Sequence, residues 1–196
     1  KEIIKKGGKV VLWGGFIDSI KRLHRLLSKN GLQGDIVIGE TKKETNKSNL
    51  FSDEEKTRER IIEKFKKEGG GLDYIITNPI VLGESISLHK SCHHSIYFEL
   101  GYSAAPYIQS RDRIHRVWIV DGKQKQYNTH YNHIVSNEII NRVTNIDQEI
   151  FNILRAKWKR MLDTIEQDIP LLQEDEENER VNTINKIIDE YRKAKL

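Results

Sequence analysis

Short apolar runs alternate with helical patterns along most of the chain. A short apolar run bounded by turn residues predicts a buried strand, and apolar residues at helical spacing predict the buried side of a helix. The runs predict strands at residues 9–13, 35–38, 73–77 and 95–99, with further candidates at 117–120 and 133–136. The helical patterns predict helices at about residues 18–29, 52–67 and 109–116.

The order of these elements predicts the fold class. Strands that alternate with helices favour a parallel sheet with right-handed crossovers, covered by helices on both faces. From about residue 145 the pattern is helical only, with a break at Pro170. We therefore expect an α/β domain over residues 1–144 and a helical extension over residues 145–196 that packs on it.

Turn and cap residues support several of these boundaries. Gly14 and Gly15 follow the first predicted strand and break it. Residues 52–55, Ser-Asp-Glu-Glu, resemble a capping box and predict the start of the second helix. Three glycines at 69–71 end that helix, and Pro106 predicts a loop before the third.

The third predicted helix is strongly basic, with the sequence Gln-Ser-Arg-Asp-Arg-Ile-His-Arg. On an α-helix, Gln109, Arg113 and Arg116 would share one face, while Arg111 and His115 would point roughly the opposite way. Guanidinium groups offer forked donors that suit phosphate oxygens. A helix just beyond the carboxyl end of a strand would lie where open α/β sheets bind ligands. The alternative is an ordinary solvated basic face.

The same segment carries a family resemblance. The pattern Gln-x-x-Asp-Arg-x-His-Arg resembles motif six of superfamily-two helicases, in the form typical of the Swi/Snf-type DNA-dependent ATPases. Residues 9–16, Lys-Val-Val-Leu-Trp-Gly-Gly-Phe, look like motif four of that family. Residues 83–88 look like motif five, except that Ser85 and Ser87 replace the usual Gly and Asn. The resemblance runs from about residue 9 to about residue 157 and implies a RecA-like lobe.

The resemblance also implies roles for individual residues. Arg113 and Arg116 would reach the γ-phosphate of ATP bound by another lobe, and Gln109 would orient the nucleotide. Further nucleotide-binding residues would be Gly83 and Glu84. The residues expected to contact the DNA backbone are Gly14, Gly15, Phe16, Thr77, Asn78, Ser85 and Ser87.

The chain lacks a Gly-x-x-x-x-Gly-Lys-Ser/Thr phosphate loop and an Asp-Glu-x-His magnesium motif. It therefore resembles the second lobe of such a motor only. ATP and Mg²⁺ would be held mainly by an N-terminal RecA-like lobe absent from this chain, which starts with Lys rather than Met. The expected partners are that lobe and double-stranded DNA, and we expect no ATP hydrolysis by the isolated chain.

Composition and charge change this picture little. A hydrophobic content of 37% with 13 glycines in 196 residues fits a folded globular protein. The net charge of +4 does not by itself argue for nucleic acid binding. Lys21, Arg22 and Arg25 on the first predicted helix could contact DNA phosphates or only solvate the helix. The single cysteine fits a reducing compartment, and no run is long enough to span a bilayer, so we expect a cytoplasmic protein without membrane partners.

One segment invites a metal interpretation. His89-x-x-Cys92-His93-His94 contains residue types that bind zinc. However, adjacent side chains in a segment that enters a strand point in different directions, and no second cluster completes a site. We expect no metal here and a small core position for Cys92.

These observations favour the C-terminal motor lobe of an ATP-dependent DNA translocase or helicase. A bacterial restriction or phage-defence system is the favoured setting, and a transcription-associated remodelling ATPase is an alternative. A non-catalytic helicase-like scaffold or DNA-binding lobe is a second alternative, which the changes in motif five favour and the intact arginines oppose.

Overall fold

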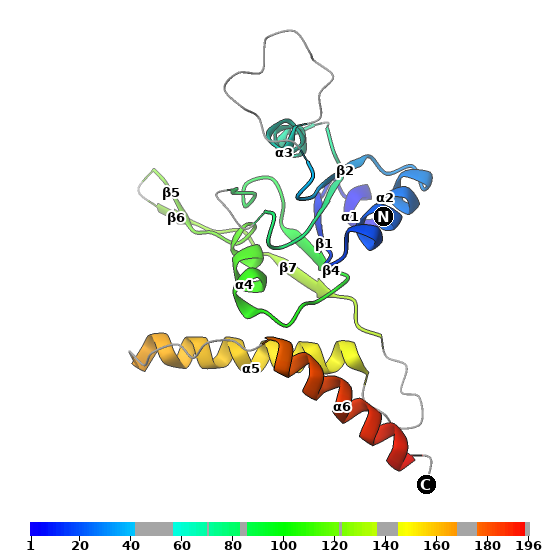
Figure 1. The fold of residues 1–196 in the computed structure, drawn as a ribbon. Helices are drawn as coiled ribbons and strands as arrows, with labels where there is room; N and C mark the ends of the chain where they lie inside the picture. Colours follow the sequence, from blue (N-terminus) through cyan, green and yellow to red (C-terminus); the bar gives the residue numbers. More distant parts are fainter. Residues whose placement is uncertain are drawn as a thin grey trace. The chain divides into compact units, whose positions relative to one another are not determined.

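The computed structural model describes residues 1–41, 57–69, 71–82, 86–121, 123–136, 145–167 and 176–194. The chain forms two compact units. Figure 1 shows its helices and strands as a ribbon. Unit 1 comprises Lys1–Phe98 and Gln109–His133. Unit 2 comprises Glu99–Ile108 and Ile134–Leu196.

A parallel sheet is the centre of unit 1. In the described part of the chain it has five strands in the order β2-β3-β1-β4-β7. The strands are β1 (Val10–Trp13), β2 (Gly34–Val37), β3 (Tyr74–Thr77), β4 (His94–Tyr97) and β7 (His130–His133). Each neighbouring pair is parallel and starts in register, so the amino ends lie along one edge of the sheet and the carboxyl ends along the other.

The central strands form because their side chains are apolar on both faces. Every residue of β1 and β3 is buried. Helix α2 (Ile17–Lys29) buries Ile20 against one face, next to the short α1 (Glu2–Lys5), while α3 (Arg58–Lys66) buries Ile61, Ile62 and Phe65. Burial of each such side chain stabilises the fold by about 1.5–3 kcal/mol. The strands predicted at residues 9–13, 35–38, 73–77 and 95–99 and the helix at 18–29 are confirmed within one or two residues.

The start of α3 differs from the prediction. Thr57 has an extended backbone and its side chain accepts a hydrogen bond from the Arg60 amide, so Thr57 is the N-cap. The helix therefore begins at Arg58 rather than running on from the predicted cap at Ser52, which lies outside the described residues. At the other end the Lys9 ammonium donates to the carbonyls of Phe65 (2.5 Å) and Lys67 (2.7 Å), which lack partners within the helix.

The prediction for the last strands was partly wrong. β5 (Trp118–Val120) pairs antiparallel with β6 (Lys123–Lys125) in a separate two-stranded sheet of the described chain. The strand that joins the main sheet is β7, ahead of the predicted 133–136. It has no apolar pattern to reveal it and is stabilised by pairing with β4 and by ring stacking of His130 on His94, 4.9 Å apart.

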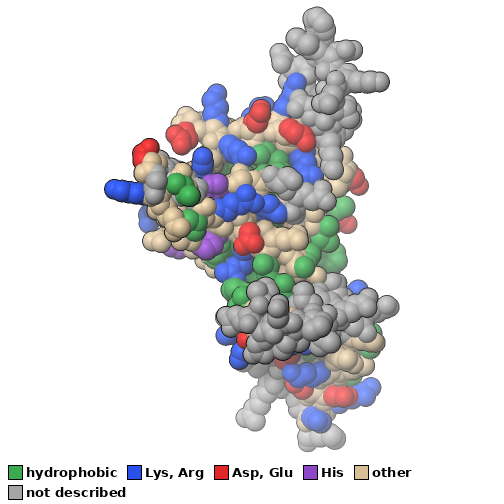
Figure 2. Space-filling model, turned by 90° about the vertical axis from the view of Figure 1, so that its left-hand side faces the viewer, with side chains coloured by type: hydrophobic (Ala, Val, Ile, Leu, Met, Phe, Trp, Pro, Cys, Tyr) green, Lys and Arg blue, Asp and Glu red, His purple; other side chains and the backbone are tan. Residues whose placement is uncertain are grey.

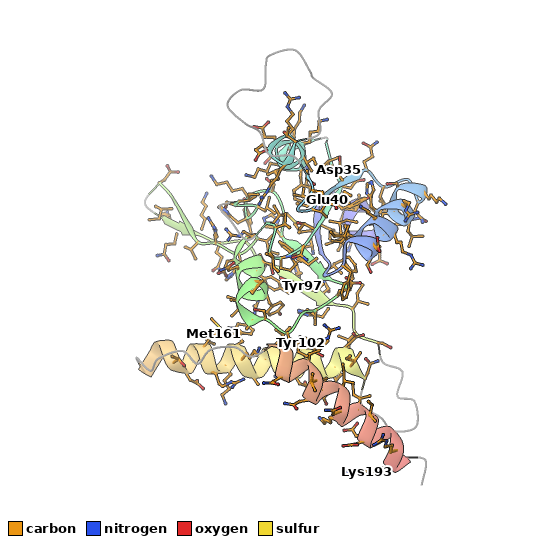
Figure 3. All side chains as sticks on the ribbon, viewed as in Figure 1. Asp35, Glu40, Tyr97, Tyr102, Met161 and Lys193 are labelled. Atoms are coloured by element: carbon orange, nitrogen blue, oxygen red, sulfur yellow. The ribbon has the colours of Figure 1, made fainter. Side chains whose placement is uncertain are left out.

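Tyr97, labelled in Figure 3, is the buried last residue of β4. Its ring stacks on Trp13 (6.0 Å) on one side and on His133 (5.0 Å) on the other. Its hydroxyl shares a hydrogen bond of 2.7 Å with Ser110, near the end of α4 (Ala104–Asp112). This contact fixes the end of α4 relative to the sheet.

Unit 2 is helical, as predicted from about residue 145. α5 (Ile146–Gln167) starts after Asn145, whose side chain accepts from the Asp147 amide, and α6 (Glu176–Ala194) follows. Lys186 of α6 bonds Glu149 of α5 at 2.7 Å. The buried Lys157 donates to the carbonyl of Tyr102, a residue labelled in Figure 3, at 2.8 Å. The break at Pro170 lies outside the described residues, and none of the described helices is long and apolar enough to cross a membrane.

Candidate functional site

Two neighbouring loops meet at the carboxyl edge of the sheet. The amide of Gly14 after β1 donates to the carbonyl of Thr77 at the end of β3 (2.9 Å). The Asn78 side-chain amide donates to the carbonyl of Gly15 (3.0 Å). The structure thus brings together Gly14, Gly15, Phe16, Thr77 and Asn78, all of which the sequence predicts to contact DNA.

The two residues at the base of this edge have structural roles. A Cβ on Gly14 would lie 2.3 Å from the Phe98 ring, so glycine is required for that ring to pack. Thr77 is fully buried and its hydroxyl donates to the Asn78 carbonyl (3.3 Å). Neither side chain offers a group to an outside ligand, so any DNA contact at these positions would be made by the backbone.

The outer part of the same edge is exposed and apolar. Phe16 is 70% exposed and Ile80 is 72% exposed. The Asn78 side-chain oxygen accepts a hydrogen bond from the Ile80 backbone amide (2.8 Å), and the Asn78 side-chain nitrogen donates to the Gly15 carbonyl. Asn78 therefore connects the loop after β3 to the loop after β1. We call Phe16, Asn78 and Ile80 the carboxyl-edge ridge.

The helix that carries the predicted arginine row ends early. α4 begins at Ala104, so Pro106 lies in its first turn rather than in a loop, where the missing amide costs nothing. It ends at Asp112 because the Arg113 carbonyl accepts from the Leu88 amide (2.8 Å) and the chain turns to bury Ile114. The prediction of one helix face holding Gln109, Arg113 and Arg116 was therefore wrong.

Gln109 is exposed on α4, Arg113 is half-buried in the turn, and Arg116 is exposed after it. The Arg116 Nε donates back to the Asp112 carbonyl (3.2 Å). The Arg111 guanidinium instead lies over the Tyr131 ring, 4.5 Å from its centre. Arg111 and Arg116 thus make different contacts, the first to a ring of β7 and the second to the end of α4.

The arginines lie towards the amino edge, opposite to the expected side. The Leu88 carbonyl accepts from the Cys92 amide (2.9 Å), and the Cys92 thiol donates to the carbonyl of Lys9, just before β1. A helix between parallel strands returns the chain to the amino edge, so its last residues lie far from the strand end it follows. The prediction considered only where the helix starts.

Cations gather around this turn. Burial and then the neighbouring charges of Arg116, Lys90, His93 and Lys66 lower the pKa of His89. Burial and Arg116 likewise lower the pKa of Arg113, and Asp112 opposes the shift. We call Lys66, Lys90, Arg113 and Arg116 the amino-edge cation cluster. Figure 2 shows a face of the molecule on which Lys and Arg side chains gather with His side chains beside them.

Ser87 belongs to this cluster rather than to the carboxyl edge. Its hydroxyl lies within hydrogen-bond distance of His89 Nδ1. Sequence reasoning considered His89 only as a zinc ligand and missed Lys66 and Lys90. The signal available for His89 and Lys90 was their position directly after the motif-five segment. Gly83, Glu84 and Ser85 lie outside the described residues, so their predicted roles stay predictions.

The segment considered for zinc is built for packing. Cys92 is fully buried as predicted, and burial raises the pKa of its thiol to about 12. His93 Nε2 bonds the His89 carbonyl (3.1 Å) and its ring lies 4.3 Å from that of Tyr127, while His94 stacks on His130. Within the described ranges no three Cys, His or acidic side chains come together as metal ligands do.

On α2, Lys21 pairs with Glu40 (3.6 Å) and Arg25 Nε donates to the Lys21 carbonyl (3.3 Å). Both contacts are exposed and satisfy only part of each side chain. They are typical of a solvated helix face and leave the DNA-contact interpretation of Lys21, Arg22 and Arg25 a prediction.

Among the solved structures that the chain resembles are two ATPase domains. The crystal structure of the C-terminal part of the Fun30 ATPase domain is 19% identical with a TM-score of 0.55, and the match covers 78% of this chain and 40% of that one. The Sulfolobus solfataricus SWI2/SNF2 ATPase core domain is 20% identical with a TM-score of 0.51, and covers 84% of this chain and 28% of that one. No family model and no curated protein matches the chain.

These similarities define the fold. The chain has the α/β fold of a RecA-like lobe of the Swi/Snf-type superfamily-two ATPases, which confirms the predicted fold class and resemblance. It spans less than half the length of either structure, and at these identities the likeness concerns the fold alone.

Proposed function

We propose that the chain is the C-terminal motor lobe of an ATP-dependent DNA translocase or helicase. The observation that carries the proposal is the bond from the Leu88 amide to the Arg113 carbonyl, 2.8 Å long. It joins the segment resembling motif five to the segment resembling motif six, so that Ser87, Arg113 and Arg116 lie together on one side of a RecA-like sheet.

The amino-edge cation cluster would serve ATP bound by the N-terminal lobe. Arg113 and Arg116 would stabilise negative charge that develops on the γ-phosphate, a role worth about 10³–10⁵ in rate for an arginine finger. Gln109, with Gly83 and Glu84, would position the nucleotide. Mg²⁺ would be held by the other lobe, where it would neutralise phosphate charge.

The carboxyl edge would contact the DNA backbone. Gly15 and Phe16 are exposed there, and Asn78 holds their loop against the end of β3. Phosphate contacts of this kind are independent of sequence, so we expect DNA binding that weakens steeply with salt. The family resemblance gives the same proposed role to Ser85 and to Ser87, although Ser87 lies beside the amino-edge cation cluster.

The setting we favour is a bacterial restriction or phage-defence complex, with a transcription-associated remodelling ATPase as the alternative. Ser85 and Ser87 stand where motif five usually has Gly and Asn, which favours a non-catalytic scaffold lobe. The presence of both Arg113 and Arg116 favours an active motor lobe.

The test uses the full-length protein, which would carry both lobes. We expect ATP hydrolysis that double-stranded DNA stimulates, and its near-complete loss in Arg116→Ala with DNA affinity retained. A full-length protein that binds DNA but hydrolyses no ATP would instead identify the scaffold.

A further inference from the structure

Ser87 and His89 form a pair whose chemistry the proposed roles do not use. Ser87 Oγ and His89 Nδ1 share a hydrogen bond, and the rest of the segment is firmly held. The Leu88 backbone amide donates a hydrogen bond to the Arg113 carbonyl, and the His89 carbonyl accepts a hydrogen bond from His93 Nε2. The pair therefore has a fixed position beside Arg113 and Arg116.

The direction of this hydrogen bond decides what Ser87 can do. If Nδ1 carries the proton, it donates to the serine oxygen, and the serine hydroxyl is free to donate to a third group. If Nδ1 carries no proton, the serine hydroxyl must donate its only hydrogen bond to the imidazole and has none left for another group. Only the first arrangement makes Ser87 a donor to an anion.

The surroundings favour an anion as that third group. Lys66 on α3, Lys90 and His93 on the same segment, and Arg116 after α4 all lie close enough to influence the charge of His89. Together with burial they keep the imidazole neutral, so one ring nitrogen donates and the other accepts. The neutral His89 and Ser87 side chains would therefore add a directional hydrogen bond to a phosphate that the neighbouring arginines attract by charge.

We propose that His89 is a positioning residue: its Nδ1–H holds the Ser87 hydroxyl as a hydrogen-bond donor to the phosphate chain that Arg113 and Arg116 bind. The proposal rests on the proposed motor function and moves Ser87 from the DNA-contacting set to the nucleotide-binding set. No proton is transferred in this role. His89 Nδ1–H donates a hydrogen bond to the Ser87 oxygen, and this bond orients the Ser87 O–H towards a phosphate oxygen.

The first test separates the two imidazole nitrogens by substitution. In the full-length protein, His89→Asn places an amide donor near the Nδ1 position, whereas His89→Gln places it near Nε2. We expect Ser87→Ala and His89→Gln to lower kcat by about tenfold to a hundredfold and His89→Asn to retain more activity. DNA affinity should stay unchanged in all three. The matched control is Ser91→Ala, a half-buried serine on the same segment whose hydroxyl donates to the backbone carbonyl of Lys66 (3.3 Å).

These outcomes are distinguishable from failure of the proposed function. A wild-type protein without DNA-stimulated hydrolysis would reject the motor. A wild-type motor that Arg116→Ala inactivates, but that His89→Gln and Ser87→Ala leave intact, would overturn the present proposal alone. Loss of DNA affinity in Ser87→Ala would return Ser87 to the DNA-contacting set.

A second readout does not depend on activity. Imidazole ¹⁵N chemical shifts, with the His89 signal assigned by its loss in His89→Asn, report which nitrogen carries the proton. The proposal requires Nδ1–H at neutral pH, and a rise of the His89 pKa when ATP is added, because the anion offsets the neighbouring cations. A proton on Nε2, or an ATP-independent pKa, would overturn it.

Discussion

The two edges of the sheet differ in what holds them together and in what they expose. The carboxyl edge is built from backbone bonds and an amide side chain, and it exposes the apolar Phe16 and Ile80. The amino edge exposes Lys66, Lys90 and Arg116 around a hydrogen-bonded Ser87–His89 pair.

This difference arises from chain topology. In a parallel sheet every crossover carries the chain from the carboxyl edge back to the amino edge. Loops directly after strands therefore collect at one edge, and the last residues of crossover helices collect at the other. The apolar residues of the carboxyl edge and the cations of the amino edge alternate along the sequence but lie at opposite edges of the sheet. Substitutions at one edge should therefore leave the role of the other edge unchanged.

The largest expected effect lies at the amino edge. Arg116→Ala and Arg113→Ala should each lower ATP hydrolysis by the full-length protein by about 10³–10⁵, or about 4–7 kcal/mol, with DNA affinity almost unchanged. Arg116→Lys should also be strongly impaired, because lysine lacks the planar fork. Steady-state turnover and DNA titration of the same preparations measure both quantities.

The control for these variants is Arg155→Ala, an exposed arginine on α5. Arg111 is a less neutral choice, because its guanidinium packs on Tyr131. If Arg116→Ala lost hydrolysis and DNA affinity in proportion, the two edges would not be functionally separate.

The next effect is on stability and belongs to the carboxyl edge. Gly14→Ala would force its Cβ to within 2.3 Å of the Phe98 ring. Overpacking of this kind costs about 1–3 kcal/mol of the free energy of unfolding, measured by denaturant titration. Gly39→Ala is the matched control, because nothing lies within 4 Å of a Cβ there. Phe98→Leu should recover part of the loss in Gly14→Ala; no recovery would argue against the Phe98 contact as its cause.

Phe16 tests the other half of the comparison. Because Phe16 is 70% exposed, Phe16→Ala should change the free energy of unfolding little. It should weaken DNA binding by about tenfold, or about 1.4 kcal/mol, while ATP hydrolysis at saturating DNA stays near the wild-type rate. Fluorescence anisotropy at several salt concentrations measures the affinity. An unchanged affinity together with slower hydrolysis would reverse the proposed roles of the two edges.

The sequence was sufficient for the sheet interior because burial leaves a simple pattern. Residues 10–13 and 74–76 are apolar throughout, as strands buried on both faces require, and both runs lie in central strands. β7 could not be found this way, since His130–His133 is polar and is stabilised by stacking on β4 rather than by burial of its own apolar side chains.

The sequence named Ser87, Arg113 and Arg116 as candidate residues, whereas it predicted neither Lys66 and Lys90 beside them nor the arrangement of the group. The spacing of Gln109, Arg113 and Arg116 is compatible with a helix face, and nothing local shows that the Leu88 amide ends the helix at Asp112. That bond joins segments 25 residues apart, so only the tertiary structure reveals it. The grouping of Ser87 with the cations depends on the same bond.

The smallest expected effect concerns pH and involves histidines at both edges. Burial lowers the pKa of His89, His94 and His133, which lie on β4, on β7 or on the segment that leads into β4. A histidine whose folded pKa is depressed contributes stability that is present above its unfolded pKa of about 6.5 and is lost as pH falls through the folded pKa. The free energy of unfolding should therefore decline as pH falls below about 6.5.

Denaturant titrations between pH 7.5 and pH 5 measure this decline, at about the range in which histidine titrates. His133→Gln should make the decline shallower, because the ring that stacks on Tyr97 and lies near Arg111 no longer has to stay neutral. His115→Gln, which removes an exposed ring, should leave the slope close to that of the wild type. Equal slopes for the wild type, His133→Gln and His115→Gln would mean that carboxylates, and not the half-buried rings of His94 and His133, set the acid sensitivity of unit 1.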